Sequence, residues 1–571
     1  MELTRRGFLL QSSSAAVAVA WSAAFKVPAA SAHSSLPPPP GFPADIELYQ
    51  QGFENWAGDI VVDDLWTSVA RTAQDLVTLA NWACGAGWTL RPRGKMHNWS
   101  PLSVVPGSDI SRVLLVDTTE WLTAMSIVPG SPVAVRVQTG ATMDSLLAFL
   151  EQRGYGVTAH PAPGDITVGG ALAIDGHGTA VPAVGETRTA GQTYGTLSNL
   201  VRSLTAVVWD AASSAYVLRV FDRSHPDCKA FLTHLGRALL SEVTLAVGAN
   251  SNLRCQSLVS VPASELFAPA GSGGRTFSSY VEASGRVEAI WFPFTQKPWL
   301  KVWTITPRKP LLARRVTSPY NYIFADAVPE VVSDLADQII SGNGAATPLF
   351  GAVEYEVVVT GLLATLGYDL WGPAKNTMLY VRPTTLRVTA NGYAILCRRS
   401  DIQRVLSEFT NAYLSKVAAF QAEGSYPMNG PVEIRVTGLD HAGDCGVAGA
   451  EPPALSAVRP RADHPEWDVA VWLDILTFPG TPDSNRFYGE LETWIYANYS
   501  GSYAAVRVEW SKGWGYSAEA AWANPAVVGT LVPDSFRAGP DPTWDWALQT
   551  LDAYDPARVF SNDFLDVLTS A

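Results

Sequence analysis

A short run of residues with mixed chemistry, "RPRGKMHNWS" at positions 91–100, lies near the N-terminal end of the chain. It follows an apolar run and contains three cations, one histidine, a glycine and a proline. The chain as a whole is acidic, with a formal net charge of −13. The positive charge gathered in this one turn is therefore a local feature, and it needs a local chemical explanation.

A second glycine-bearing loop, "HPAPGDITVGGALAIDGHGTAVP", covers residues 160–182. The pattern G-x-G-x-x-G, which marks a Rossmann dinucleotide site, occurs nowhere in the chain. The chain has two separate glycine-bearing loops instead. Glycines in such loops let backbone N–H groups approach a phosphate that a side chain would keep away.

A glutamate stands beside a dense aromatic cluster in "RVEAIWFPFTQKPWLKVW", residues 286–303. On a strand, Glu288 would share a face with Ile290, Phe292 and Phe294. If that face lines a pocket, the hydrocarbon around Glu288 should raise its pKa toward the range of a general base. If the other face is buried, Glu288 lies in water, and the residues alone leave both readings open.

The segment "PVEIRVTGLD", residues 431–440, alternates strictly between apolar and polar side chains. Glu433 and Arg435 fall on one face, and strand residues two apart lie about 7 Å from each other, within pairing reach. On the residues alone, a solvated face with an exposed ion pair of little energetic value is the favoured interpretation.

Two further segments carry carboxylates that we expect on strands. "WDVAVWLDILTFPG", residues 467–480, reads as an inner strand with Asp474 among apolar neighbours. "VEYEVVVTG" has Glu354 and Glu356 at strand spacing, for which a solvated face is the safer interpretation. No metal-binding constellation is visible, and no serine or cysteine nucleophile has a convincing partner.

Mixed secondary structure must position these residues. We expect a helix over residues 61–83, capped by Asp63 or Asp64, and then a short strand entering the first loop. A strand, a glycine break and a helix capped by Thr142 follow, with a stop at Gly154. From about residue 255 to 500 long alternating strands dominate, with helices such as 402–422 between them.

Composition narrows the class of protein. The chain has 571 residues, 47% hydrophobic and 16% charged, enough for two or more domains with sizeable cores. The acidic balance argues against a nucleic-acid partner. The five cysteines are scattered, without a C-x-x-C spacing, so no disulfide framework is expected.

The N-terminus has the features of a targeting segment. Paired Arg5 and Arg6 precede a weakly apolar run that ends near "PAASAHSS", where an A-x-A site suits cleavage. The twin arginines resemble the Tat signal of bacteria, which exports folded proteins. We therefore expect a signal peptide over residues 1–32, a secreted mature protein, and no other stretch long and apolar enough to span a bilayer.

The two glycine-bearing loops together resemble the FAD-binding domain of the vanillyl-alcohol oxidase (PCMH-type) family. The resemblance implies an α+β protein with a two-subdomain FAD-binding domain and a substrate domain built on a large antiparallel sheet flanked by helices. It implies an FAD domain at 41–254, a substrate domain at 255–500, and a segment at 501–571 that returns to the FAD domain. The implied cofactor contacts are Pro92, Arg93, Gly94, Lys95, Met96, Asn98, Trp99, Gly164, Asp165, Thr167, Gly169, Gly170, and Asn562 within "DPARVFSNDFL".

Many members of that family attach FAD covalently to a histidine of the first loop. The matching residue here is His97, with His177 as the alternative, which we read as a packing residue near the adenosine end. A neutral imidazole is the form that attacks, and neighbouring cations help to keep it neutral. Arg91, Arg93 and Lys95 would also balance the pyrophosphate.

"RPRGKMHNWSPL" together with "WFPFTQKPWLKVW" is similar to the covalent-flavin, type II cholesterol oxidases. That likeness implies oxidation of the 3β-hydroxyl of a sterol, isomerisation to the 4-en-3-one and reduction of O2 to H2O2, without a metal. It implies catalytic roles for Glu288, Glu433 and Arg435, the last two beside the flavin and linked to oxygen access. It also implies transient contact with sterol-containing membranes. The similar enzymes tend to carry an amide where this chain has Asp474, so the role of that carboxylate is open.

Three other functions compete with this one. The nearest is an oxidase of the same fold that acts on a polyol, a sugar lactone or an aromatic alcohol. A sugar pocket would be lined by polar groups, so the aromatic cluster after Glu288 favours an apolar substrate. The others are a non-catalytic secreted flavin carrier or adhesion module, and a membrane-anchored dehydrogenase that uses another electron acceptor.

Overall fold

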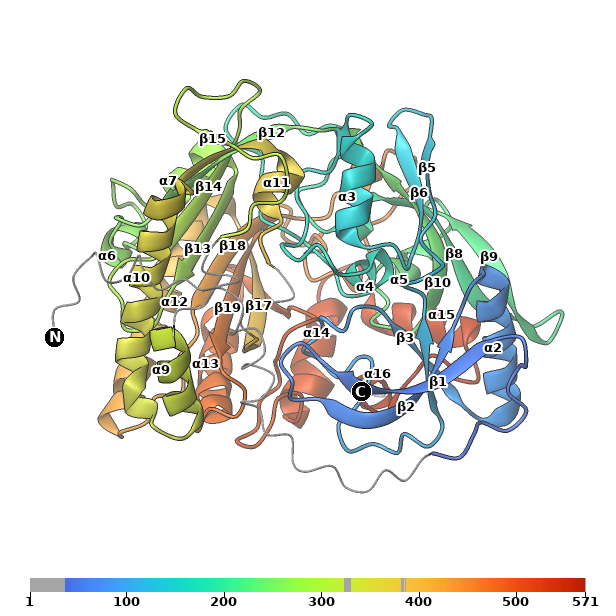
Figure 1. Ribbon diagram of the computed structural model, residues 1–571. Coiled ribbons are helices and arrows are strands. Elements are labelled where there is room, and N and C mark those ends of the chain that lie inside the picture. The colour runs from blue at the N-terminus through green and yellow to red at the C-terminus, as the bar shows by residue number, and fades with distance from the viewer. Residues whose placement is uncertain (1–35, 323–329, 382–384, 386, 570–571) are drawn as a thin grey trace.

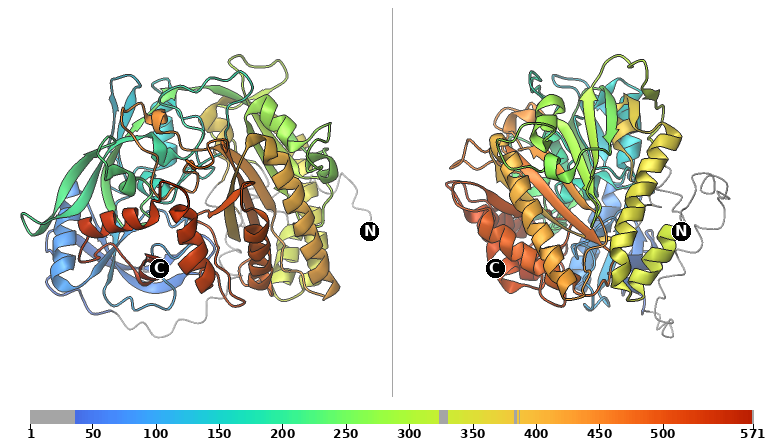
Figure 2. Two further views of the ribbon diagram at one scale, coloured as in Figure 1. Left: turned by 180° about the vertical axis from the view of Figure 1, so that it is seen from behind. Right: turned by 90° about the vertical axis from the view of Figure 1, so that its left-hand side faces the viewer.

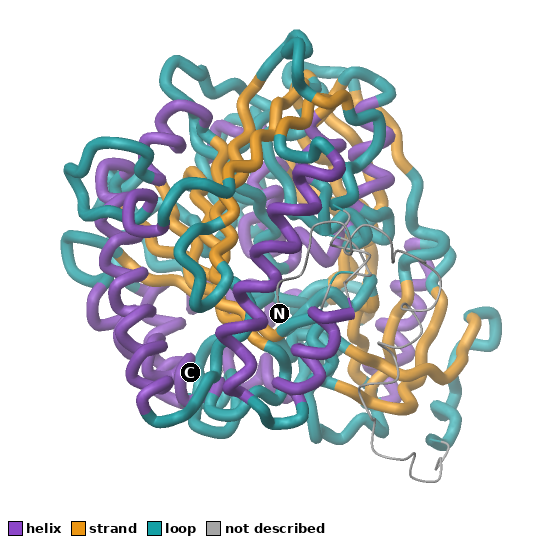
Figure 3. The backbone as a smooth tube through the Cα atoms, turned by 60° about the vertical axis from the view of Figure 1, so that its left-hand side comes forward, coloured by secondary structure: helices purple, strands orange, loops and turns teal. Residues whose placement is uncertain are grey.

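The computed structural model of the chain describes residues 36–322, 330–381, 385 and 387–569. The expected signal peptide at 1–32 lies outside the described residues. The strands form two groups with helices along their outer sides (Figure 3). One half holds the early part of the chain and its C-terminal helices, and the other holds the middle part (Figure 1).

A four-stranded sheet in the order β1-β2-β4-β3 opens the first half. Its elements are β1 (Glu47–Glu54), β2 (Val61–Val69), β3 (Thr89–Arg93), β4 (Val113–Asp117) and helix α2 (Ala73–Ala86). The expected helix over 61–83 is wrong in its first part, because Val61–Val69 pairs with β1 on one side and β4 on the other. The helix starts later, at a capping box between Thr72 and Asp75.

A five-stranded antiparallel sheet in the order β5-β6-β10-β8-β9 completes this half. Its strands are β5 (Met125–Val128), β6 (Ala134–Gln138), β8 (Val201–Asp210), β9 (Ala215–Asp222) and β10 (Leu239–Ala246), and β7 (Tyr155–Gly156) pairs separately with β11 (Gly248–Ala249). Its short helices are α3 (Met143–Glu151), α4 (Val168–Ala173), η1 (Leu197–Leu200) and α5 (Cys228–Leu232). The predicted strand, glycine break and helix capped by Thr142 are confirmed.

The second half is built on a nine-stranded sheet in the order β15-β16-β12-β14-β13-β18-β19-β17-β20. The strands are β12 (Asn252–Leu258), β13 (Arg286–Trp291), β14 (Trp299–Ile305), β15 (Arg314–Arg315), β16 (Asp369–Pro373), β17 (Thr389–Cys397), β18 (Val432–Gly438), β19 (Val469–Thr477) and β20 (Ala505–Val508). All neighbours are antiparallel except β15 and β16. The predicted fold class, α+β with a large antiparallel sheet, is confirmed.

The middle part of the chain also forms helices, several of which cover the outer side of this sheet (Figure 1). They include α6 (Ala263–Leu266), α7 (Phe277–Ser284), α9 (Glu330–Ile340), η2 (Gly344–Ala346), α10 (Thr347–Thr365), α11 (Ala374–Met378), η3 (Arg399–Asp401), α12 (Ile402–Ala422), η4 (Ala442–Cys445) and α13 (Ser484–Asn498). Helix α12 has the predicted bounds. Its Val405 and Phe409 pack in one core with Ile434 and Leu473 of the sheet.

Two expectations about the segment now seen as α10 are wrong. Glu354 and Glu356 lie on this helix and not on a strand, because the run of apolar residues around them continues for five turns and packs on the sheet through Val358 and Leu362. The expectation that no stretch beyond the signal peptide is long and apolar enough to span a bilayer is wrong as well. Gly344–Thr365 meets that test by length and composition alone. Core helices pass the same test, and the buried side of α10 is packed against protein.

The C-terminal segment leaves the nine-stranded sheet after β20 and passes through η5 (Val527–Leu531), α14 (Val532–Arg537), α15 (Trp544–Tyr554) and α16 (Asp563–Thr569). These red helices lie beside the early blue and green elements (Figure 2, left). The last part of the chain thus contributes to both halves. All five cysteines are free thiols.

Candidate active site

A cavity of about 360 Å³ lies where the two halves meet. The first loop, the second loop and the nine-stranded sheet all contribute to its wall. Of the residues singled out from the sequence, its wall includes Pro92, Arg93, Gly94, Lys95, Met96, His97, Asn98, Trp99, Thr167, Gly169, Gly170, His177, Glu288, Glu433 and Arg435. Gly164, Asp165, Asp474 and Asn562 are not part of the wall.

His97 is held in one orientation by two neighbours. Its ring stacks on Trp56 with 4.3 Å between centroids, and its Nε2 lies 2.8 Å from Oδ2 of Asp165. Burial raises the pKa of Asp165, but the hydrogen bond and charge of His97, with the charge of Lys95, outweigh burial and lower it. An ionised Asp165 only accepts, so Nε2 carries a proton, and in a neutral His97 ring the lone pair would be on Nδ1.

The cations of the first loop have partners within the protein. Arg91 is buried and donates to the carbonyls of Leu102, Ser103, Gly236 and Phe560. Burial lowers its pKa to about 9. Arg93 pairs with the carboxylate of Asp117. All three cations line the cavity, and Lys95 is exposed without an ion pair to a described carboxylate, so their role toward a phosphate stays a prediction.

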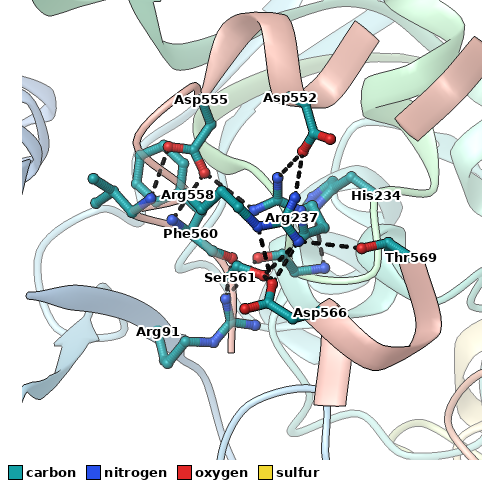
Figure 4. A network of polar contacts seen from close by, with 12 residues as sticks. Arg91, His234, Arg237, Asp552, Asp555, Arg558, Phe560, Ser561, Asp566 and Thr569 are labelled. Carbon is teal, nitrogen blue, oxygen red and sulfur yellow. Dashed lines mark hydrogen bonds and ion pairs between the residues drawn. The ribbon is translucent and has the colours of Figure 1, made fainter. Parts of the chain in front are cut away.

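Arg91 belongs to a wider polar network at the C-terminal end of the chain (Figure 4). Arg237 pairs with Asp552 and Asp555, and Asp555 accepts from the backbone N–H of Phe560. These contacts fix the Phe560 carbonyl that receives Arg91. Because Arg91 lies on β3, the network ties this strand to the C-terminal segment.

Glycines bring the two loops into contact. A Cβ added at Gly94 would lie 2.7 Å from Oγ1 of Thr167, and one at Gly169 would lie 2.9 Å from Cβ of Thr139. Thr167 also caps α4 by accepting from the N–H of Gly170. These glycines are thus required for the close approach of one chain segment to another, besides leaving backbone open to the cavity.

His160 gives the cavity an unpaired polar atom, and sequence analysis did not single it out. Its Nδ1 contacts the carbonyl of Pro161, while its buried Nε2 has no protein partner. Burial lowers the pKa of His160 to about 4, so the ring is neutral and Nε2 is an acceptor. A glycine-lined cavity with an unsatisfied acceptor fits a large ligand with hydroxyl or amino donors, as a flavin dinucleotide has.

On the opposite wall, Glu288 is the centre of a buried charged group. It lies on β13 opposite Lys301 of β14 and Arg435 of β18. Arg435 Nε donates to it over 2.7 Å, the hydroxyl of Tyr380 over 2.6 Å, and Lys301 Nζ lies 3.5 Å away. Glu288 is 1% exposed, so the alternative of a glutamate in water is wrong.

The expectation of a raised pKa for Glu288 is wrong. Burial does raise its pKa, but the charges of Arg435 and Lys301 and the hydrogen bond from Tyr380 outweigh burial and lower it. The sequence could not show this, because both cations come from other strands. Glu288 is therefore ionised at neutral pH and able to accept a proton.

Arg435 is held by three carboxylates at once. Besides Glu288, its Nη1 donates to Asp474 over 2.8 Å and its Nη2 donates to Glu433. Only the planar guanidinium can serve three acceptors in one plane. Glu433 and Arg435 line the cavity, so the solvated ion pair favoured from the residues alone is wrong.

Asp474 is completely buried behind this group, next to a second buried acid, Glu509. Burial raises its pKa well above the usual value, and the neighbouring charge of Glu509 raises it further. Oδ1 of Asp474 and Oε2 of Glu509 are both buried without another partner. We assign the proton to Asp474, which donates to Glu509, while Lys512 lies 3.7 Å from Asp474 on the other side.

His177 packs against the sheet of the second half. Its ring stacks on Trp472 with 3.7 Å between centroids, and its Nε2 lies 3.7 Å from Glu509. It therefore lines the cavity near the buried acids. Asn562 donates to the carbonyls of Pro101, Leu102 and Ser103, so it holds the loop rather than facing the cavity.

Lys301 and Tyr380 were missed by sequence analysis. Lys301 is fully buried, and its ammonium lies against the rings of Trp299, Trp303 and Tyr380. Burial lowers its pKa to about 8, although Glu288 acts in the opposite direction. The only sequence signal was a lysine at an inward position of an apolar strand. Glu509 and Lys512 gave no signal at all.

Comparison with known proteins identifies two protein families whose models match this chain. The family "Cholesterol oxidase, substrate-binding" matches residues 252–570, and "FAD binding domain" matches residues 67–211. A solved "solvent-stable cholesterol oxidase" is 58% identical and covers 93% of this chain and 99% of its own, with a TM-score of 0.92. A search of curated proteins finds no match.

Two structures of cholesterol oxidase from Brevibacterium sterolicum, one of them a histidine-to-alanine mutant, also match. The mutant is 44% identical and the other is 43% identical; each covers 94% of this chain and 100% of its own, with a TM-score of 0.92. The substrate-binding match covers more than half of this chain. The chain belongs to the cholesterol oxidase family, whose members combine an FAD-binding domain with a sterol-oxidase substrate domain.

Proposed function

We propose that this protein oxidises the 3β-hydroxyl of cholesterol or a related sterol, isomerises the product to the 4-en-3-one, and passes the electrons to O2 to form H2O2. The observation that carries the proposal is the composition of one cavity. Flavin-binding loops form one wall, and the other combines the buried Glu288–Arg435 pair with apolar side chains such as Trp303, Met378 and Leu476. An apolar alcohol fits such a wall better than a sugar does.

FAD, when bound, supplies the hydride acceptor. Glu288 is ionised and accepts the hydroxyl proton, since Arg435, Lys301 and Tyr380 stabilise its charge. Arg435 faces the cavity and stabilises negative charge on the substrate oxygen. Glu433, on the same side of Arg435, is the second carboxylate that can move a proton between sterol carbons.

The test is peroxide release from the flavin-loaded protein with cholesterol, compared with a polyol, a sugar lactone and an aromatic alcohol. Only the sterol should give rapid turnover. Glu288→Gln keeps the shape of the side chain but cannot take a proton, so it should lower kcat by at least about a hundredfold. Turnover of a sugar or an aromatic alcohol in place of the sterol would contradict the proposal, as would full activity of Glu288→Gln.

FAD is attached covalently through His97 in this proposal. The support is the orientation of the ring, whose Nδ1 lone pair is left free by the contact with Asp165. After acid denaturation, the yellow colour should remain with a peptide that contains His97. His97→Ala should lose that colour on denaturation, whereas His177→Ala should keep it. A colourless wild-type pellet would disprove the attachment.

Secretion is a further part of the proposal. It is supported by Arg5, Arg6 and the small-residue run that follows them. The protein should appear outside the cytoplasm with its N-terminus near residue 33, and Arg5→Lys/Arg6→Lys should retain it inside. Mass spectrometry of the exported protein identifies the cleavage point, and export of the double variant would contradict the twin-arginine route.

A further inference from the structure

Two neighbouring leucines project into solvent at one end of the nine-stranded sheet. Leu311 is 92% exposed and Leu312 is 88% exposed. They lie in the segment 306–313 that joins β14 to β15, at the top of Figure 1. The buried Ala313 anchors the segment directly after them. The structure thus holds two large apolar side chains in water on a short, anchored loop.

Cations flank the two leucines. Arg308, Lys309, Arg314 and Arg315 are all exposed, and no acid interrupts the run from residue 307 to 316. None of the four forms an ion pair with a carboxylate of the part of the chain that the structure describes. In a protein of net charge −13, this is a concentrated patch of unpaired positive charge.

The end of α10 extends the apolar area. Arg314 donates to the carbonyl of Thr365 and pairs with Leu370 in the sheet, so the loop lies beside the C-terminus of the helix. Three apolar side chains are exposed there: Leu363, Leu366 and Tyr368. We call Leu311, Leu312, Leu363, Leu366 and Tyr368, with the four cations, the docking surface.

The docking surface is connected to the cavity by two strands. β14 carries Trp303 of the cavity wall and runs directly into the loop. β16 follows α10 and leads through α11 to Met378 and Tyr380, which also line the cavity. The surface therefore lies at the end of the elements that form the apolar wall.

We propose that the docking surface binds the face of a lipid bilayer that contains anionic lipids. Exposed leucines gain free energy by entering the boundary between headgroups and acyl chains, and cations beside them gain from anionic headgroups. Neither gain is available in water. The choice of a bilayer, where sterols reside, rests on the proposed function, but the binding itself requires no turnover.

Sedimentation of the flavin-loaded protein with vesicles tests the proposal. The vesicles contain phosphatidylcholine and cholesterol, with or without phosphatidylserine. Leu311→Ser/Leu312→Ser should weaken partitioning into phosphatidylserine vesicles by about tenfold or more. The matched control is Val184→Ser/Val220→Ser, which removes two valines that are 78% and 64% exposed elsewhere. It should partition like wild type, and all proteins should unfold at the same temperature.

A second variant tests the charge. Arg308→Gln/Lys309→Gln should weaken binding to phosphatidylserine vesicles by about tenfold and leave binding to neutral vesicles unchanged. Added salt should reduce the difference between the two kinds of vesicle, because salt screens exposed charges.

Three results would overturn the proposal: no binding of wild type to either vesicle, equal binding of wild type and the leucine variant, or a dimer in solution that the leucine variant dissociates.

Turnover of detergent-solubilised cholesterol is measured in parallel. If wild type does not turn over cholesterol in detergent, the proposed function is rejected. The vesicle experiment tests separately whether the docking surface binds lipid. Unchanged turnover in detergent with slower turnover from vesicles is the pattern expected for the leucine variant.

Discussion

Replacing Asp474 with asparagine should change how the free energy of unfolding depends on pH. The buried group around Arg435 contains four carboxylates (Glu288, Glu433, Asp474 and Glu509) and three cations (Lys301, Arg435 and Lys512). One bound proton makes this group neutral, and the structure assigns it to Asp474. An asparagine at this position donates to Glu509 in the same way but carries no exchangeable charge.

The magnitude follows from proton binding. The folded chain keeps the proton of Asp474, whereas the unfolded chain releases it above about pH 4. Above that pH, unfolding releases this proton, so the contribution of Asp474 to the free energy of unfolding falls as the pH rises. The loss is about 1.4 kcal/mol for each pH unit until the pH reaches the raised pKa, and below about pH 4 there is no loss. Between about pH 5 and pH 8 the variant should therefore gain stability relative to wild type as the pH rises, by up to about 1.4 kcal/mol for each pH unit below the raised pKa.

Urea unfolding of the flavin-loaded proteins at several pH values in this range measures the effect. Asp545→Asn is the control, because Asp545 lies at the surface beside Arg537 and its pKa is lowered. Asp545 is ionised in both states above pH 5 or so, and its variant should run parallel to wild type. Parallel curves for Asp474→Asn and wild type would show that Asp474 is ionised in the folded protein and that the reasoning is wrong.

Three other substitutions probe the cavity. Arg435→Lys keeps one positive charge but cannot serve three carboxylates, so kcat/KM for the sterol should fall by about a hundredfold, and wild-type kinetics would contradict the guanidinium's role. Lys301→Met removes a group of pKa about 8, so any limb of the rate profile near that pH should disappear, and an unchanged profile would show that Lys301 does not titrate during turnover. Gly94→Ala places a methyl group 2.7 Å from Oγ1 of Thr167, so the protein should bind less flavin, which absorbance measures, and full flavin content would show that the loops can separate.

The sequence predicted local features better than contacts between distant segments. The helix at 402–422 and the cap at Thr142 were correct because their signals lie within one turn or one repeat. Residues 61–69 were misassigned because their apolar positions fit a helix as well as a strand. Pairing with β1 and β4 makes this segment a strand, and no pattern within the segment predicts that pairing.

The electrostatics of the site depend on such long-range pairing. Glu288 was singled out with burial and exposure both left open, and the pKa shift expected for the buried case had the wrong direction because Lys301 and Arg435 reach it only through strand register. The same holds for Arg91, whose partner Phe560 lies at the other end of the chain. Residue types indicated candidate groups for the chemistry, whereas the charge states of these groups depend on the assembled sheet.

The tie between Arg91 and Phe560 has a consequence for biosynthesis. A ribosome finishes the early flavin-binding elements long before it reaches the carbonyl that anchors Arg91, so a nascent chain cannot complete this site. We therefore expect the cavity to reach its final form only after Phe560 has been synthesised. Removal of the chain from Phe560 onward should therefore impair flavin uptake, although Phe560 is distant in sequence from the first loop.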